Sequence, residues 1–229
     1  MRLSAPLILL ATSLSLAQLA FGATIGQLDT FQDGTTGGWF AGGLGTGAVP
    51  PIPPQVVANG GPQGTGDRYL QITGLGGDGP GSKIAVINVA QWAGNYLSSG
   101  ISGISMDLKN FGTTDLTIRL LFEDPMMGPP VDQAVTTAGT FLPVGGGWTR
   151  AFFPITTSSM TTLSGNVTTL LGNTTLIRII DSPTPSDAVS IVGVLGIDNI
   201  NANAVPEPST WLVVIGSLAC MAARKRRAS

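Results

Sequence analysis

The sequence predicts an all-β fold, a two-sheet antiparallel β-sandwich with one short helix. Glycine occurs 32 times and proline 16 times, and both residue types end helices and shape tight turns. Hydrophobic residues make up 43% of the chain and charged residues 10%, a balance that supports a folded core and argues against disorder. The apolar residues recur in short runs of period two, which is typical of strands with one buried face.

The clearest of these runs lies between residues 116 and 123. Its apolar members face one way and its polar members face the other: Leu116, Ile118, Leu120 and Phe122 against Thr117, Arg119 and Glu123. Further strand candidates are residues 26–31, 69–73, 83–89, 104–108, 148–155, 176–180 and 191–200. So many strands in a single domain predict two packed antiparallel sheets.

One segment, residues 156–173, has a helical period instead. Its apolar side chains recur at i, i+4, i+7 and i+8, namely Leu163, Val167, Leu170 and Leu171. Ser158 or Ser159 is available as the N-cap, and Gly172 as the stop. We therefore expect one short helix across the edge of the sandwich.

Residues 1–22 have the layout of a secretory signal peptide. Arg2 supplies positive charge ahead of an apolar stretch, and Ala20 and Gly22 put small side chains at −3 and −1 of a cut before Ala23. The alternative is a buried first helix of the domain. We expect the export machinery to recognise this signal helix and to remove it.

The C-terminal part carries an apolar run and a basic cluster. Residues 211–223 are apolar and begin with Trp211, and four cations follow directly: Arg224, Lys225, Arg226 and Arg227. A helix of this length spans about 20 Å, less than the roughly 30 Å of a bilayer core. An interfacial Trp and snorkelling cations extend the effective span, and the positive-inside rule puts the basic end in the cytoplasm. We expect a short transmembrane helix in the inner membrane.

A sorting motif precedes this helix. After a short polar linker at residues 201–204 come Val205, Pro206, Glu207 and Pro208. Motif, helix and basic end in this order, over residues 205–229, resemble the PEP-CTERM sorting signal of Gram-negative bacteria. The resemblance implies an exosortase-like membrane transpeptidase as partner, cutting near an extended Pro-Glu-Pro segment. The protein would then leave its transient anchor for the cell envelope or extracellular matrix. A plain tail anchor that is never cleaved is the alternative.

The domain between these signals, residues 23–204, holds six basic and twelve acidic residues, a net charge of −6. Such a domain repels phosphate backbones, so nucleic acid is not an expected partner. The chain has no histidine, and its one cysteine, Cys220, lies in the C-terminal apolar run. An internal disulfide is therefore excluded, and the usual nucleophile constellations are missing.

The carboxylates do not form an obvious catalytic pair. Glu123 and Asp124 are adjacent, so a strand would point them to opposite faces. Asp181 and Asp187 flank prolines and are expected as turn residues. We expect no enzyme and no catalytic residue, although two carboxylates brought together by folding could still serve a glycosidase.

A second resemblance concerns the domain itself. Residues 29–34 with Gly38 and Trp39, and residues 195–200 near the end, are similar to the first and last strands of jelly-roll carbohydrate-binding modules and laminin-B-like domains. The resemblance implies a jelly-roll-like sandwich in which these two strands lie side by side.

A structural calcium ion can pin those strands in such jelly rolls. The positions that carry over are Asp29, Asp33 and Asp198, with Asn199 as a carbonyl donor, because Ca²⁺ prefers oxygen ligands. The alternative is that these residues form turns and cap strand ends. No other cofactor is expected.

Glycan binding would need aromatic side chains on an exposed face. The candidates are Trp39, Phe40, Trp92, Tyr96, Phe111 and Trp148. Loops at residues 42–54 and 125–130 could shape a cleft.

The leading hypothesis is a non-enzymatic structural or matrix protein, with exopolysaccharide as a partner. The alternatives are an extracellular carbohydrate-binding module and a glycan-active enzyme.

The sorting hypothesis predicts a shortened mature protein. Intact-mass analysis of protein from cells is expected to place the C-terminus near Pro206–Pro208, because the helix holds the motif at the membrane for cutting. A mass that retains residues 224–227 would instead favour the plain anchor.

Overall fold

The computed structural model describes residues 22–42, 47–125 and 128–204. The predicted signal helix and the predicted sorting segment lie outside these residues. This applies to the whole motif, to the membrane helix and to the basic cluster: Val205, Pro206, Glu207, Pro208, Trp211, Arg224, Lys225, Arg226 and Arg227. The boundaries given to both segments stay predictions.

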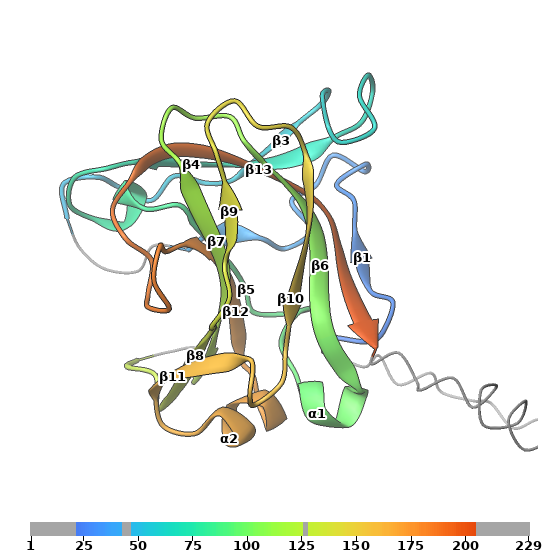
Figure 1. Ribbon diagram of the computed structural model, residues 1–229, viewed down its shortest axis with the longest axis vertical. Coiled ribbons are helices and arrows are strands. Elements are labelled where there is room, and N and C mark those ends of the chain that lie inside the picture. The colour runs from blue at the N-terminus through green and yellow to red at the C-terminus, as the bar shows by residue number, and fades with distance from the viewer. Residues whose placement is uncertain (1–21, 43–46, 126–127, 205–229) are drawn as a thin grey trace, which may run out of the picture.

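The described residues fold into a sandwich of two antiparallel sheets, which confirms the predicted fold class (Figure 1). The six-stranded sheet has the order β10 (Thr149–Pro154), β6 (Ile101–Asn110), β13 (Val192–Ala204), β4 (Tyr69–Leu75) and β3 (Gln55–Val57), with β1 (Leu28–Asp29) paired to β13. The seven-stranded sheet has the order β11 (Met160–Ser164), β8 (Asp132–Thr136), β7 (Leu116–Asp124), β12 (Leu176–Asp181), β5 (Ala85–Asn88) and β2 (Phe40–Ala41), with β9 (Thr140–Leu142) paired to β7. Two short helices, α1 (Tyr96–Ser99) and α2 (Val167–Gly172), lie at one end, and a 3₁₀ turn (Pro80–Ser82) follows β4.

The core lies between the two sheets. The inner face of β7 contributes the four apolar residues of its predicted alternation, and the six-stranded sheet contributes a matching set from β6 and β13: Ile104, Met106, Leu108, Leu195 and Ile197. Burying a side chain of this size contributes about 1.5–3 kcal/mol. The period-two pattern therefore sets the strands and also supplies the force that packs the sheets.

Strand β13 is longer than the sequence suggests. Residues 201–204 were expected as a polar linker, but they pair with β6, from Asn201 opposite Ser105 onward. An irregularity in pairing begins after Asp198, where Asn199 has a φ of +50°. Such a bulge adds a residue to one strand and shifts its alternation. Ile200 thereby still faces the core, so the linker prediction is wrong.

The helix predicted over residues 156–173 is only partly present. Its first half forms β11, which pairs with β8 and contains two β-branched threonines, Thr161 and Thr162. Ser159 does not cap a helix, because its hydroxyl accepts from the N–H of Thr156 in a turn. The helix begins only after Asn166, whose side chain accepts from the N–H of Thr169 at 3.0 Å. Thr-rich composition and sheet pairing outweighed the helical spacing of the leucines.

A half-buried carboxylate joins β1 to the core. Oδ2 of Asp29 accepts the indole N–H groups of Trp39 and Trp92, each at 2.8 Å, and the carboxylate also accepts the amide of Gln91. Burial raises the pKa of Asp29, while these hydrogen bonds oppose the shift. One side chain thus satisfies the polar groups of two tryptophans that are otherwise fully packed in the core.

Replacing this carboxylate should be costly. Asp29→Ala leaves two buried indole N–H groups without acceptors, and we expect a loss of roughly 2–4 kcal/mol in the free energy of unfolding. Urea denaturation of the isolated domain measures it. Asp33→Ala is the matched control, because that carboxylate lies in an exposed turn with Thr35; an equal loss for both variants would contradict the role given to Asp29.

Candidate functional site

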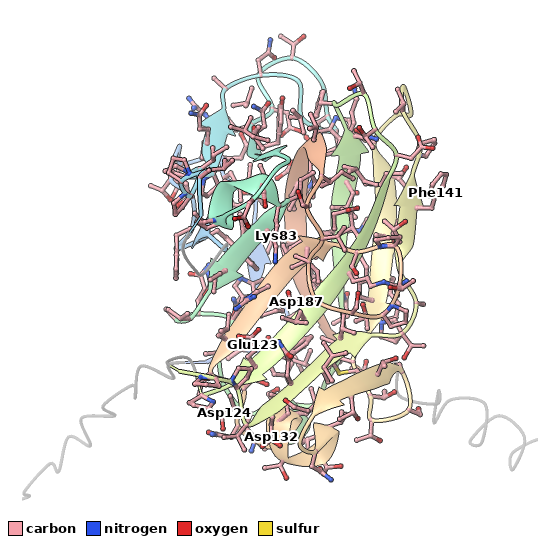
Figure 2. The ribbon with its side chains drawn as sticks, turned by 90° about the vertical axis from the view of Figure 1, so that its left-hand side faces the viewer. Lys83, Glu123, Asp124, Asp132, Phe141 and Asp187 are labelled. Atoms are coloured by element: carbon pink, nitrogen blue, oxygen red, sulfur yellow. The ribbon has the colours of Figure 1, made fainter. Side chains whose placement is uncertain are left out.

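A polar pocket lies on the outer face of the seven-stranded sheet. Figure 2 looks onto this face, with Lys83, Asp187 and Glu123 gathered near its middle. The pocket has a volume of about 240 Å³. Its polar lining comes from five segments of the chain: Lys83, Glu123, Gln133, Arg178 and Asp187. It is smaller than the roughly 300–1,000 Å³ of pockets for drug-sized ligands, so it suits one small polar group of a larger ligand.

The loops that the sequence offered as cleft-forming do contribute to this pocket. Gly42, at the start of one, and Gly128 and Pro130, in the other, line it. The remaining wall is the loop after β12, which carries Asp187 and Ala188.

Arg178 and Glu123 form a buried ion pair at the pocket floor. They project from the neighbouring strands β12 and β7, and Nη2 of Arg178 lies 3.0 Å from Oε2 of Glu123. Gln133 of β8 donates to Oε1 of the same carboxylate at 2.8 Å. Burial raises the pKa of Glu123, and the charge of Arg178 opposes that rise. Two charges held this far from water are expensive to keep unless each is matched, which makes the pair a fixed part of the site.

An exposed aromatic ring lies on the same face. Phe40 of β2 is opposite Ile87 of β5, and Ile87 is opposite Arg178 of β12. Directly opposed residues in antiparallel strands share a face, so Phe40 and Arg178 stand in one row, two strand spacings or about 10 Å apart. The Phe40 side chain is 43% exposed. This face therefore offers one exposed aromatic ring in the same row as charged donors and acceptors.

The other aromatic candidates have different places. Trp39, Trp92 and Tyr96 are buried in the core. Phe111 and Trp148 pack with Tyr69 on the outer face of the six-stranded sheet, where Tyr69 stacks on Phe111 with ring centres 5.2 Å apart. Both rings rest on Gly196 of β13, where a Cβ atom would lie only 2.6 Å from the Phe111 ring. In this second cluster the three rings therefore pack mainly against one another.

The predicted calcium residues have separate partners. Asp29 holds the two tryptophans, and Asp33 accepts the backbone N–H of Thr35 at 2.8 Å. Asp198 is fully buried and accepts the backbone N–H of Asn199. Within residues 22–42, 47–125 and 128–204, no three acidic or other typical ligand side chains gather closely enough to hold a metal ion. Calcium binding stays a prediction.

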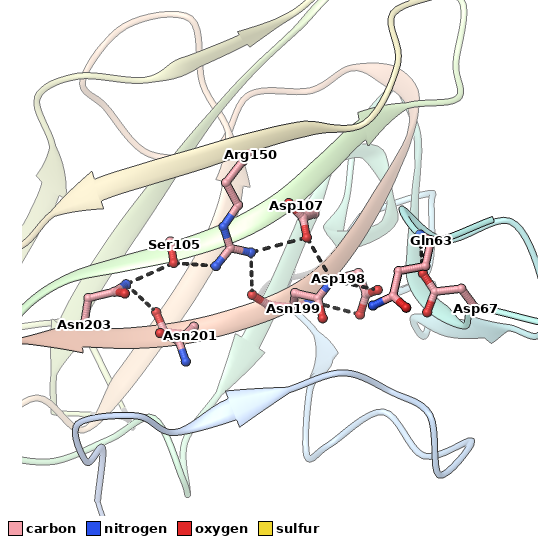
Figure 3. A network of polar contacts seen from close by, with 9 residues as sticks. All are labelled: Gln63, Asp67, Ser105, Asp107, Arg150, Asp198, Asn199, Asn201 and Asn203. Carbon is pink, nitrogen blue, oxygen red and sulfur yellow. Dashed lines mark hydrogen bonds and ion pairs between the residues drawn. The ribbon is translucent and has the colours of Figure 1, made fainter.

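Asp198 belongs instead to a polar network across β6, β13 and β10 (Figure 3). Asn199 donates to Asp107 at 2.8 Å, and Arg150 lies 3.3 Å from the same carboxylate. Burial raises the pKa of Asp198 to about 7, and the nearby charges of Asp67 and Asp107 add to the shift. Burial thus brings the pKa of Asp198 close to neutral pH.

The residues of the pocket were mostly missed by sequence reasoning. Glu123 was correctly placed on the outward face of its strand, and Asp187 was expected only as a turn residue. Arg178 gave the available signal, because it is the single charge within Leu-Ile-Arg-Ile-Ile of a predicted strand. A cation inside an otherwise apolar strand needs a buried partner or a ligand.

In the part of the chain that the structure describes, no helix is long and apolar enough to cross a membrane.

The sequence matches no protein-family model and no curated protein. Solved structures do share the fold. A family 11 carbohydrate-binding module from Clostridium thermocellum, in complex with a β-1,3-1,4-mixed-linked tetrasaccharide, is 14% identical with a TM-score of 0.50, and the match covers 80% of this chain and 98% of that chain. The family 11 module of the cellulosomal cellulase Lic26A-Cel5E of Clostridium thermocellum gives the same identity and TM-score, over 80% and 97%. An exo-β-agarase is 12% identical with a TM-score of 0.53, over 80% of this chain and 26% of that chain. The fold is therefore of the kind found in jelly-roll carbohydrate-binding modules.

The network around Asp198 predicts a pH-dependent stability. Its pKa in the folded state, about 7, lies above the ordinary 3.8, so the folded state binds the proton more tightly than the unfolded chain. The stabilisation is complete below about pH 4 and is lost as the pH rises through about 7. In chelator, the domain should melt several degrees lower at pH 8 than at pH 5, as measured by calorimetry. Asp198→Asn should shrink that difference, whereas an unchanged difference would show that Asp198 does not carry it.

Proposed function

We propose that the domain binds extracellular carbohydrate on the outer face of the seven-stranded sheet, without altering it chemically. The observation that carries the proposal is the row in which exposed Phe40 stands beside the polar pocket of Arg178 and Glu123. Sugars present apolar C–H faces and hydroxyl groups together. A ring and a set of fixed donors and acceptors on one face suit both.

The likeness in fold to carbohydrate-binding modules supports this proposal over a purely structural role. The family 11 module from Clostridium thermocellum was solved with a mixed-linked tetrasaccharide bound. At 14% identity the likeness extends to the fold alone, so the argument for binding rests on the pocket and on Phe40.

The way in which the pocket carboxylates are held supports a binding role over catalysis. Glycosidases use one carboxyl group as an acid and another as a base or nucleophile. Glu123 is already engaged by Arg178 and Gln133, and the chain contains no histidine to serve as another base. A bound sugar would be held and released unchanged.

The export and sorting signals complete the proposed role. Removal of the signal peptide, transient anchoring and exosortase-like processing would deliver the domain to the envelope. There, glycan binding would help retain it in an exopolysaccharide matrix. Calcium remains part of the proposal as a structural ion rather than as a participant in binding.

The proposal predicts that Phe40→Ala weakens glycan binding about tenfold, because a stacked ring contributes on the order of 1 kcal/mol or slightly more. Affinity gel electrophoresis with mixed-linked β-glucan, xylan and glucuronoxylan measures it. Phe152→Ala is the matched control, since Phe152 is 55% exposed on β10 of the other sheet. Equal weakening by both variants, or no retardation by any polysaccharide, would count against the proposed face or the proposed function.

A further inference from the structure

The pocket beside Arg178 has more donors than its resident acceptors use. Arg178 is 8% exposed, yet its Nε has no hydrogen-bond partner among the described residues. Its Nη2 is used by Glu123, and its Nη1 lies 3.7 Å from Oδ1 of Asp187, beyond hydrogen-bonding distance. A buried guanidinium with unused N–H groups is costly, so an acceptor that reaches Arg178 through the pocket would relieve that cost.

The two resident carboxylates are not held equally. Glu123 has a 4% exposed side chain and two close partners, whereas the side chain of Asp187 is 49% exposed. Oδ1 of Asp187 accepts from the N–H of Ala188 in its own loop, at 2.6 Å. Among the described residues, Asp187 is therefore held only by its own loop and by its distant cation, whereas Glu123 is held by two other strands. It occupies the edge of the pocket as the more exposed of the two anions.

The charges that line the pocket favour binding of an anion in the place of the Asp187 carboxylate. Lys83 lines the same pocket and takes part in no ion pair among the described residues. With Asp187 turned away, the cations Lys83 and Arg178 face only the carboxylate of Glu123. The pocket then carries one unmatched positive charge and the volume of a small group.

We infer that this pocket recognises a single carboxylate of an acidic sugar unit, a uronate, which replaces Asp187 beside Arg178 and Lys83. The inference rests on the proposed function and names its ligand class. A dense polyanion is not the ligand, because the domain carries a net charge of −6 and repels it at long range. The fitting ligand is a mostly neutral glycan with isolated uronate units.

The test compares two matched ligands by isothermal titration calorimetry on the exported domain. One is a xylan tetrasaccharide with a single glucuronate branch, and the other is the same molecule after reduction of its carboxyl group to an alcohol. We expect the acidic form to bind at least tenfold more tightly. Asp187→Asn should strengthen its binding several-fold, because the competing anion is removed, and should leave the neutral form unaffected.

A second pair of variants keeps the test independent of folding. Arg178→Gln leaves Glu123 without its cation and can unfold the domain, so Lys83→Gln is the informative change. It should weaken binding of the acidic sugar about fivefold. Lys109→Gln makes the same charge change on the other sheet, where Lys109 lies over the Phe111 ring, and should have no effect.

The outcomes separate the inference from the proposed function. Equal affinity for the acidic and neutral tetrasaccharides, both sensitive to Phe40→Ala, would overturn the inference and leave carbohydrate binding in place. Binding of a short glutamate peptide as tight as that of the acidic sugar would overturn it in favour of an acidic protein partner. If neither sugar binds and no polysaccharide retards the protein, both the uronate inference and the proposed carbohydrate binding are wrong.

Discussion

Arg119 shapes the outer face of the seven-stranded sheet. Its guanidinium donates to the carbonyls of Ser182 and Pro183 in the loop after β12, at 2.9 and 3.2 Å, and to the carbonyl of Thr136 in β8 at 2.9 Å. The residue is 5% exposed. Because a buried charge needs its donors filled, the loop is drawn down onto the sheet. The wall that carries Asp187 depends on this one side chain.

The two buried arginines of this face, Arg119 and Arg178, have different kinds of hydrogen-bond acceptor. Arg119 is satisfied by backbone carbonyls, which are fixed and carry no net charge, whereas Arg178 is satisfied by a carboxylate and keeps an N–H to spare. Around them Leu121, Val135 and Ile180 form a second small apolar cluster. Low polarity at the pocket floor strengthens every electrostatic contact there. Arg119 therefore serves the fold, and Arg178 is the side chain left available to a ligand.

The long strands could be predicted because one inner face is apolar throughout, as in β7 and β6. Strands of two to five residues, such as β2, β3, β8 and β9, are too short to show a period. The spacing of the leucines in residues 156–173 wrongly predicted helix in the first half of that segment. Sheet pairing, which is a long-range effect, determined the structure there. The bulge at Asn199 likewise could not be predicted from the spacing of apolar residues.

The site was harder to predict for a related reason. Nothing local links Glu123 to Arg178, which lie 55 residues apart in the chain, and only sheet order makes them neighbours. Phe40 joins the same face through two further strand pairings. Sequence reasoning could recognise an outward Glu123 and an odd Arg178, but the constellation exists only once β7, β12, β5 and β2 are aligned.

The position of β13 has a consequence for how the chain is handled before it is folded. This strand sits between β6 and β4 in the six-stranded sheet and also pairs with β1, although it comes last among the described elements. Until residues 192–204 are free, β6 and β4 lack their common neighbour and the core lacks one wall. In a chain that emerges N-terminus first, the strands of the seven-stranded sheet can pair earlier, but the six-stranded sheet stays incomplete until these last residues are free. The final strand therefore closes the sheet last, which delays completion of the core until nearly the whole domain is available for folding.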